Sequence, residues 1–96
     1  MKIIEMNEGP KIDYQVEDTK ITFRDELMLN LKNYERDFDV EIDICQDDNK
    51  ILLAGLSKYY VAQIFIPARQ YEDPEKTQPV PFSMDNVTLK LWKLEV

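Results

Sequence analysis

The sequence predicts a mainly β fold, a small antiparallel barrel or sandwich of six to seven strands with at most one or two short helices. Three observations support this. Several short segments alternate apolar and polar residues, which is the pattern of half-buried strands. β-branched and aromatic residues concentrate in these segments. Turn residues such as Gly9-Pro10 and Asp47-Asp48-Asn49 separate them. An α+β fold is the alternative if residues 25–34 form a helix that packs on a sheet.

The first strands are predicted between residues 2 and 24. Residues 2–6 form a short apolar run that Gly9-Pro10 ends. From residue 11 to 24, apolar and polar residues alternate on both sides of Asp18-Thr19, which predicts a β-hairpin with these two residues at its turn. This register opposes unlike charges at three of four polar pairs, each worth about 0.2–1 kcal/mol. The expected apolar pairs are Val16–Ile21 and Tyr14–Phe23, and the polar pairs are Glu17–Lys20, Gln15–Thr22, Asp13–Arg24 and Lys11–Glu26.

Residues 25–34 fit two patterns. Leucines at alternate positions are typical of a strand, whereas Leu27, Leu31 and Tyr34 would share one face of a helix that Asp25 could cap. The helix-favouring residues Leu, Met, Glu and Lys are frequent here, so we expect a short helix.

A second hairpin is expected in the middle of the chain. Residues 37–44 alternate strictly, a turn follows at residues 47–49, and residues 51–56 return as the partner strand. One face of the first strand should be buried and the other should carry carboxylates. The predicted buried face holds Phe38, Val40, Ile42 and Ile44, and the opposite face holds Asp37, Asp39, Glu41 and Asp43.

The C-terminal half predicts two strands around a long loop. Residues 58–66 are β-branched and aromatic, apolar on both faces near the end, and stop at Pro67, which has no N–H to donate. Residues 68–81 contain three prolines and should form a loop that is long for a compact domain. Residues 87–96 form the last strand, with Val87, Leu89 and Leu91 on one side and Trp92, Leu94 and Val96 on the other.

The composition limits the function. A chain of 96 residues is long enough for one domain, which we assign to residues 1–96. It has no histidine and one cysteine, Cys45, which excludes Ser-His-Asp and Cys-His nucleophilic systems and an intramolecular disulfide. We expect a protein that is not an enzyme and that holds no cofactor or metal, with carboxylate-based catalysis left open.

The charge indicates the kind of partner. The net charge of −7 repels duplex nucleic acid and anionic membrane surfaces and attracts basic proteins. No stretch approaches the roughly 20 apolar residues of a membrane span. We expect a cytoplasmic protein. The small size and acidity resemble those of accessory proteins of bacteria, phages and mobile elements, an association by composition alone.

An acidic segment is the most unusual feature. Residues 35–48 contain seven carboxylates and one base, Arg36. Carboxylates at alternate positions of one strand stand about 7 Å apart and repel one another. They form either a solvated outer face with bases on neighbouring strands, or a negative patch that docks a basic partner or imitates a nucleic-acid backbone. The candidate binding residues are Asp37, Asp39, Glu41, Asp43, Asp47 and Asp48, with Arg69 and Tyr71 from the long loop.

These observations predict a non-enzymatic protein-interaction module that uses the acidic hairpin 37–48 and the loop 69–81. Tyr and Arg are frequent at interface hot spots, although the loop could also be a poorly ordered connection. One alternative is a β-barrel that binds a small molecule or nucleotide in an aromatic-lined pocket. Another is a structural subunit whose C-terminal strand adds to another chain, which includes the case of a homo-oligomer.

Overall fold

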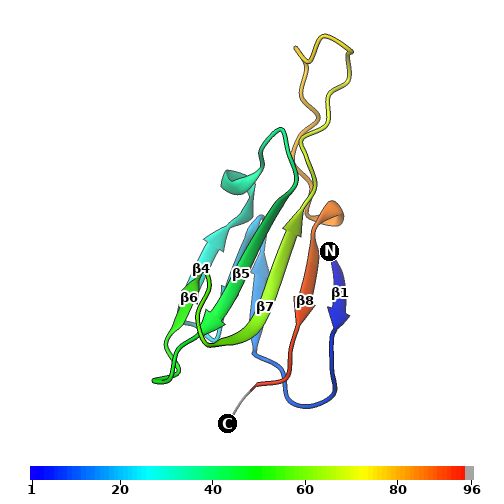
Figure 1. The fold of residues 1–96 in the computed structure, drawn as a ribbon. Coiled ribbons are helices and arrows are strands. Elements are labelled where there is room, and N and C mark those ends of the chain that lie inside the picture. The colour runs from blue at the N-terminus through cyan, green and yellow to red at the C-terminus, as the bar shows by residue number, and fades with distance from the viewer. Residues whose placement is uncertain (95–96) are drawn as a thin grey trace.

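The computed structural model describes residues 1–94, which form eight strands, two 3₁₀ helices and no α-helix. The strands make two sheets, and in Figure 1 the smaller sheet lies behind the larger one. The larger sheet has the order β1-β8-β7-β5-β6 and the smaller one β2-β3-β4. The strands are β1 (Lys2–Glu5), β2 (Tyr14–Glu17), β3 (Lys20–Phe23), β4 (Leu27–Asn30), β5 (Val40–Gln46), β6 (Leu52–Ala54), β7 (Tyr59–Ile66) and β8 (Thr88–Leu91), and the 3₁₀ helices are η1 (Leu31–Tyr34) and η2 (Met84–Asn86).

One core lies between the two sheets. Fully buried side chains come from the smaller sheet, such as Ile21 and Phe23, and from the larger one, such as Ile44, Ile64 and Leu89. The mainly β prediction is therefore confirmed in its sandwich form, since the described residues form no closed barrel. The described residues form eight strands where six to seven were expected. The larger sheet is mixed, because β1 pairs in parallel with β8.

The first hairpin has the predicted register. Its four pairs are Tyr14–Phe23, Gln15–Thr22, Val16–Ile21 and Glu17–Lys20. The turn residue Asp18 has a φ of 53°, a left-handed conformation that Asp tolerates. Beyond the strands the ion pairs differ from those expected, because Arg24 pairs with Glu26 (2.9 Å) and Lys11 with Glu5 (3.5 Å).

The expected helix at residues 25–34 was wrong for its first half. Residues Leu27–Asn30 form β4, which pairs antiparallel with β3, and only Leu31–Tyr34 make a single 3₁₀ turn. The two strands are joined at Arg24 and Asp25, which have φ values of 52° and 56°. The free edge of β3 offers backbone hydrogen bonds and a place to bury Leu29, and this pairing overrides the helix propensity.

The second hairpin, β5–β6, is confirmed, with a return strand of only three residues. Its turn is held by Asp47, whose Oδ1 accepts hydrogen bonds from the N–H groups of Asn49 (2.8 Å) and Ile51 (3.0 Å). However, β5 begins at Val40, so residues 37–39 precede the strand. Strand β7 ends before Pro67 as predicted. Its pairing with β5 is irregular at Ile44/Cys45.

The last strand is shorter than predicted and lies inside its sheet. It ends at Leu91, and Val87, Leu89 and Leu91, which were expected on one side, are all buried; the prediction for Val96 falls outside the described residues. Because β8 pairs with β7 on one side and β1 on the other, it has no free edge, and strand addition at this strand is ruled out. In the part of the chain described, no helix has the length and apolar character to cross a membrane.

Candidate functional site

A long looped arm extends beyond the sandwich between β7 and η2, at the top of Figure 1. We call residues 68–82 the arm. Its two sides are joined by hydrogen bonds from Val80 N–H to Gln70 O (2.8 Å) and from Glu72 N–H to Gln78 O (2.9 Å). At the tip, Asp73 accepts hydrogen bonds from the backbone N–H groups of Thr77 and Gln78. The predicted loop is therefore a hairpin-like projection with its own hydrogen bonds.

The base of the arm is joined to the segment that precedes β5. The guanidinium of Arg69 pairs with Glu35 (3.3 Å) and with Asp37 (3.4 Å), and it donates a further bond to the carbonyl of Glu35. The hydroxyl of Tyr71 donates to Asp37 Oδ1 at 2.6 Å. The backbone N–H of Ala68 donates to Asp39 Oδ1 at 2.8 Å. Four predicted site residues, two from each candidate region, thus meet at the base of the arm.

These contacts fix the charge and the position of Arg69. Its hydrogen bonds with Tyr71 and then with Glu35 raise the pKa of Arg69 above its ordinary value. The guanidinium therefore stays protonated at any physiological pH. It compensates Glu35, which is mostly buried, and part of the charge of the exposed Asp37.

Phe38 is the residue whose position the alternating pattern predicted wrongly. It was expected on the buried face of the strand with Val40 and Ile42, but 64% of its surface is exposed. The reason is that residues 37–39 lie before β5, where the chain crosses to the arm and Asp37 and Asp39 bind arm residues. An exposed phenylalanine between two carboxylates is a possible hot spot in a chain that buries its other phenylalanines at least partly. Only its aromatic side chain could have marked Phe38 as a candidate binding residue from the sequence.

The remaining predicted site residues lie elsewhere. Glu41 and Asp43 belong to β5, where Asp43 accepts a hydrogen bond from Gln63 of β7 at 2.9 Å. Asp47 and Asp48 lie at the opposite end of the sandwich from the arm. There Asp47 holds the turn, and Asp48 pairs with Lys58 at 2.9 Å, a hydrogen bond that raises the pKa of Lys58. The acidic segment therefore does not form one continuous docking surface.

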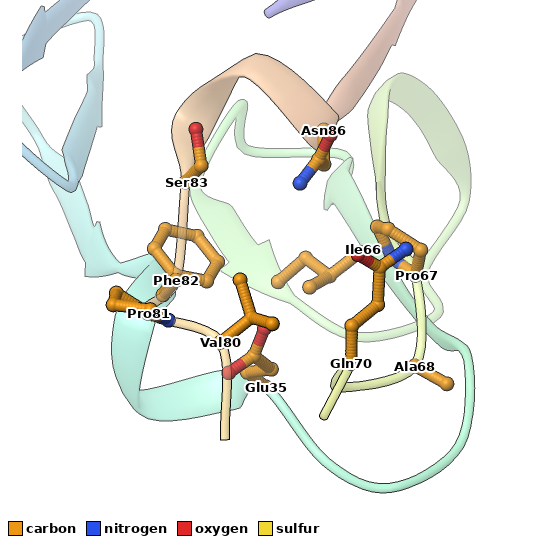
Figure 2. Close-up of a pocket in the computed structure, with 10 residues that line it drawn as sticks. All are labelled: Glu35, Ile66, Pro67, Ala68, Gln70, Val80, Pro81, Phe82, Ser83 and Asn86. Carbon is orange, nitrogen blue, oxygen red and sulfur yellow. The ribbon is translucent and has the colours of Figure 1, made fainter. Parts of the chain in front are cut away.

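A small pocket lies where the arm meets the sandwich. Figure 2 shows its apolar lining, with Ile66, Val80 and Phe82, and the amides of Gln70 and Asn86 beside it. Its volume of about 20 Å³ leaves room for no more than about one water molecule. Larger hollows reach about 510 Å³ but are open to solvent. Among the residues described, no three thiol or carboxylate groups converge as metal ligands would.

Comparisons with protein-family models, with curated proteins and with solved structures found no match for this chain.

Proposed function

We propose that this protein is a non-enzymatic protein-interaction module that binds a basic partner at the base of its arm. We call this region the arm-base surface, formed by Asp37, Phe38, Asp39 and Tyr71. The observation that carries the proposal is the 64% exposure of Phe38 between two carboxylates that the arm holds in place.

The chemistry of this surface specifies the partner. Burying an exposed phenylalanine contributes about 1.5–3 kcal/mol, so a pocket for Phe38 would supply much of the affinity. Asp37 and Asp39 would form the polar rim and favour Lys or Arg around that pocket. Because Arg69, Tyr71 and the Ala68 N–H already orient the two carboxylates, little conformational freedom is lost on binding. The proposed docking surface for a basic partner is therefore smaller than the whole acidic hairpin and lies at one end of the molecule.

Photo-crosslinking tests the location. A photoreactive phenylalanine analogue is placed at position 38 and the protein is irradiated in a lysate of cells that naturally produce it. Matched controls carry the analogue at Met28 or Leu56, which are 54% and 71% exposed and lie outside the arm-base surface. We expect a discrete crosslinked protein with a basic surface at position 38 alone. The same products at all three positions, or no product at position 38, would refute the proposal.

Substitutions test the chemistry with the crosslinked partner after it is purified. Phe38→Ala should weaken binding at least about tenfold, whereas Met28→Ala should leave it unchanged. In Asp37→Asn/Asp39→Asn, the amide oxygens still accept the bonds from Tyr71 and Ala68, so the fold is kept while two charges are lost. This variant should bind more weakly with a smaller salt dependence. Binding at low salt that is insensitive to all of these changes would exclude the arm-base surface.

A further inference from the structure

The larger sheet has one face that no described segment covers. Its inner face packs on β2–β4, and its outer face is turned toward the viewer in Figure 1. The strand registers define this outer face through two rows of neighbours across β5, β7 and β8, namely Asp43–Gln63–Lys90 and Glu41–Phe65–Thr88. All of these side chains except Glu41 are half-buried, whereas the alternate residues Ile42, Ile64 and Leu89 are buried in the core.

This outer face is more apolar than a solvated sheet face. The exposed face of an antiparallel sheet ordinarily carries polar residues. Here Phe65 lies near one end of the middle strand β7, and near the other end the rings of Tyr60 and Trp92 pack together with their centroids 5.4 Å apart. None of these aromatic side chains belongs to the core between the sheets. The apolar residues of the face are Ile4, Leu53, Tyr60, Phe65 and Trp92.

The charges on the same face are divided by its middle strand. Glu41 and Asp43 lie on the β5 side of β7, and Lys90 lies on the β8 side, with Lys2 beyond it on β1. Burial and then Asp43 raise the pKa of Tyr60 above its ordinary value. A partner of uniform charge would be attracted to one half of this face and repelled by the other. A second copy of the chain avoids that conflict.

We propose that two copies of this chain associate back to back through the outer face of the larger sheet. A two-fold axis parallel to β7 places each β5 over the β8 strand of the other copy. In the row Asp43–Gln63–Lys90, Asp43 then faces Lys90 of the second copy, Lys90 faces its Asp43, and Gln63 faces Gln63. A symmetric contact of this kind needs a self-complementary patch, which the divided charges provide. Phe65 lies on one side of this row, and the Tyr60–Trp92 pair lies on the other.

The size of the face sets the strength of the dimer. Five strands about 4.8 Å apart, with a middle strand about 26 Å long, present at most about 600 Å² per copy, or about 1,200 Å² in total. This is at the lower end for specific interfaces. The net charge of −7 on each copy opposes association further. We expect dissociation at about 10–100 µM. Because the axis runs along β7, both arms project from the same end, which would make the proposed arm-base binding bivalent.

Sedimentation of matched charge reversals tests the dimer from about 1 µM to about 1 mM. Asp43→Lys and Lys90→Glu should each weaken self-association at least about tenfold, because each opposes like charges twice. An equimolar mixture of the two variants should form a mixed dimer, since every Lys then faces an acid. The matched controls Glu75→Lys and Lys76→Glu make the same charge changes on the arm tip and should leave the mass unchanged apart from net-charge effects.

Three results would overturn the dimer: a wild-type monomer at about 1 mM, a dimer that survives both reversals, or a mixture that stays monomeric. Circular dichroism checks that each variant is folded. If Asp43→Lys unfolds because it loses the hydrogen bond from Gln63, Phe65→Glu disrupts the same face without removing that bond. The outcome is separable from the proposed function, because Phe38→Ala leaves the outer face intact. That variant should lose the basic partner and keep the dimer.

Discussion

Several carboxylates in this chain stabilise the backbone rather than form ion pairs. Asp47 accepts N–H groups within the β5–β6 turn, Asp73 does so at the tip of the arm, and Asp39 accepts the N–H of Ala68. A carboxylate that accepts a backbone N–H keeps its charge while it fixes a loop. A charged residue in this chain can therefore serve the fold and still contribute to the negative potential that a partner meets.

The tip of the arm should loosen at low pH because of Asp73. Its pKa lies below the ordinary 3.8, first because the Thr77 hydroxyl donates to it and then because the Gln78 N–H does. A depressed folded-state pKa means that this stabilisation is fully present above the unfolded pKa and is lost as pH falls through the folded value. Nuclear magnetic resonance should show a lower protection factor against exchange for the Thr77 amide as Asp73 is protonated. In Asp73→Asn this pH dependence should be absent, and its persistence would disprove the assignment.

At the scale of elements, the connection from β1 to β2 is fixed by a glycine and by the chain after β8. Gly9 has a φ of 125°, which L-residues rarely adopt, and a Cβ there would lie 2.6 Å from Lys93 Cγ. Two hydrogen bonds lie beside this turn. The N–H of Lys93 donates to the side-chain oxygen of Asn7, and the N–H of Leu94 donates to the carbonyl of Pro10. The turn can therefore relax only by breaking contacts with the C-terminal segment.

Gly9→Ala should lower the free energy of unfolding by about 1–3 kcal/mol, because alanine is strained in a backbone conformation that glycine adopts readily. Chemical denaturation measures this. Adding Lys93→Ala to this variant should restore the stability lost to the clash with the Lys93 side chain. The loss caused by the strained φ at residue 9 should remain. Glu8→Ala, one residue away and exposed, should change stability by less than about 0.5 kcal/mol. Equal effects at residues 8 and 9 would contradict the argument.

The strand pairings that sequence patterns predicted are those between strands adjacent in the chain. The hairpins β2–β3 and β5–β6 are recognisable in the sequence because apolar and polar residues alternate on both sides of a polar turn. The β3–β4 connection does not, because Arg24 and Asp25 take up positive φ without the Gly or Asn that marks such turns. The parallel pairing of β1 with β8 joins the two ends of the chain, and no local pattern encodes it.

The candidate site could be predicted only in part for the same reason. Its composition was visible, since Asp37, Asp39, Arg69 and Tyr71 were all proposed from residue type. That they meet was not, because the contacts join segments more than 25 residues apart, as with Asp39 and Ala68 at a separation of 29. Alternation also predicted that the strand begins three residues too early, at Asp37 rather than Val40, and therefore predicted that Phe38 is buried. A period-two pattern identifies the faces of a strand but not where it begins.

At the scale of the whole molecule, stability and proposed binding occupy different regions. The molecule measures 49 × 21 × 21 Å, and the arm accounts for much of its length (Figure 1). The fully buried side chains lie in the sandwich, while the part of the arm from residue 71 to 79 contains only exposed and half-buried residues. The projecting part of the arm can therefore change without altering the core.

Shortening the arm should leave the sandwich nearly as stable as before. Replacing residues 71–79 by Asn-Gly joins Gln70 to Val80, which are already hydrogen-bonded, through a turn that suits a hairpin. The loss of the bond from Tyr71 to Asp37 is offset by a shorter loop, so urea denaturation should show a change below about 1 kcal/mol. Ile44→Ala, which leaves a cavity in the core, should cost about 2–5 kcal/mol in the same assay. A shortened chain that unfolded as readily as Ile44→Ala would show that the arm supports the core.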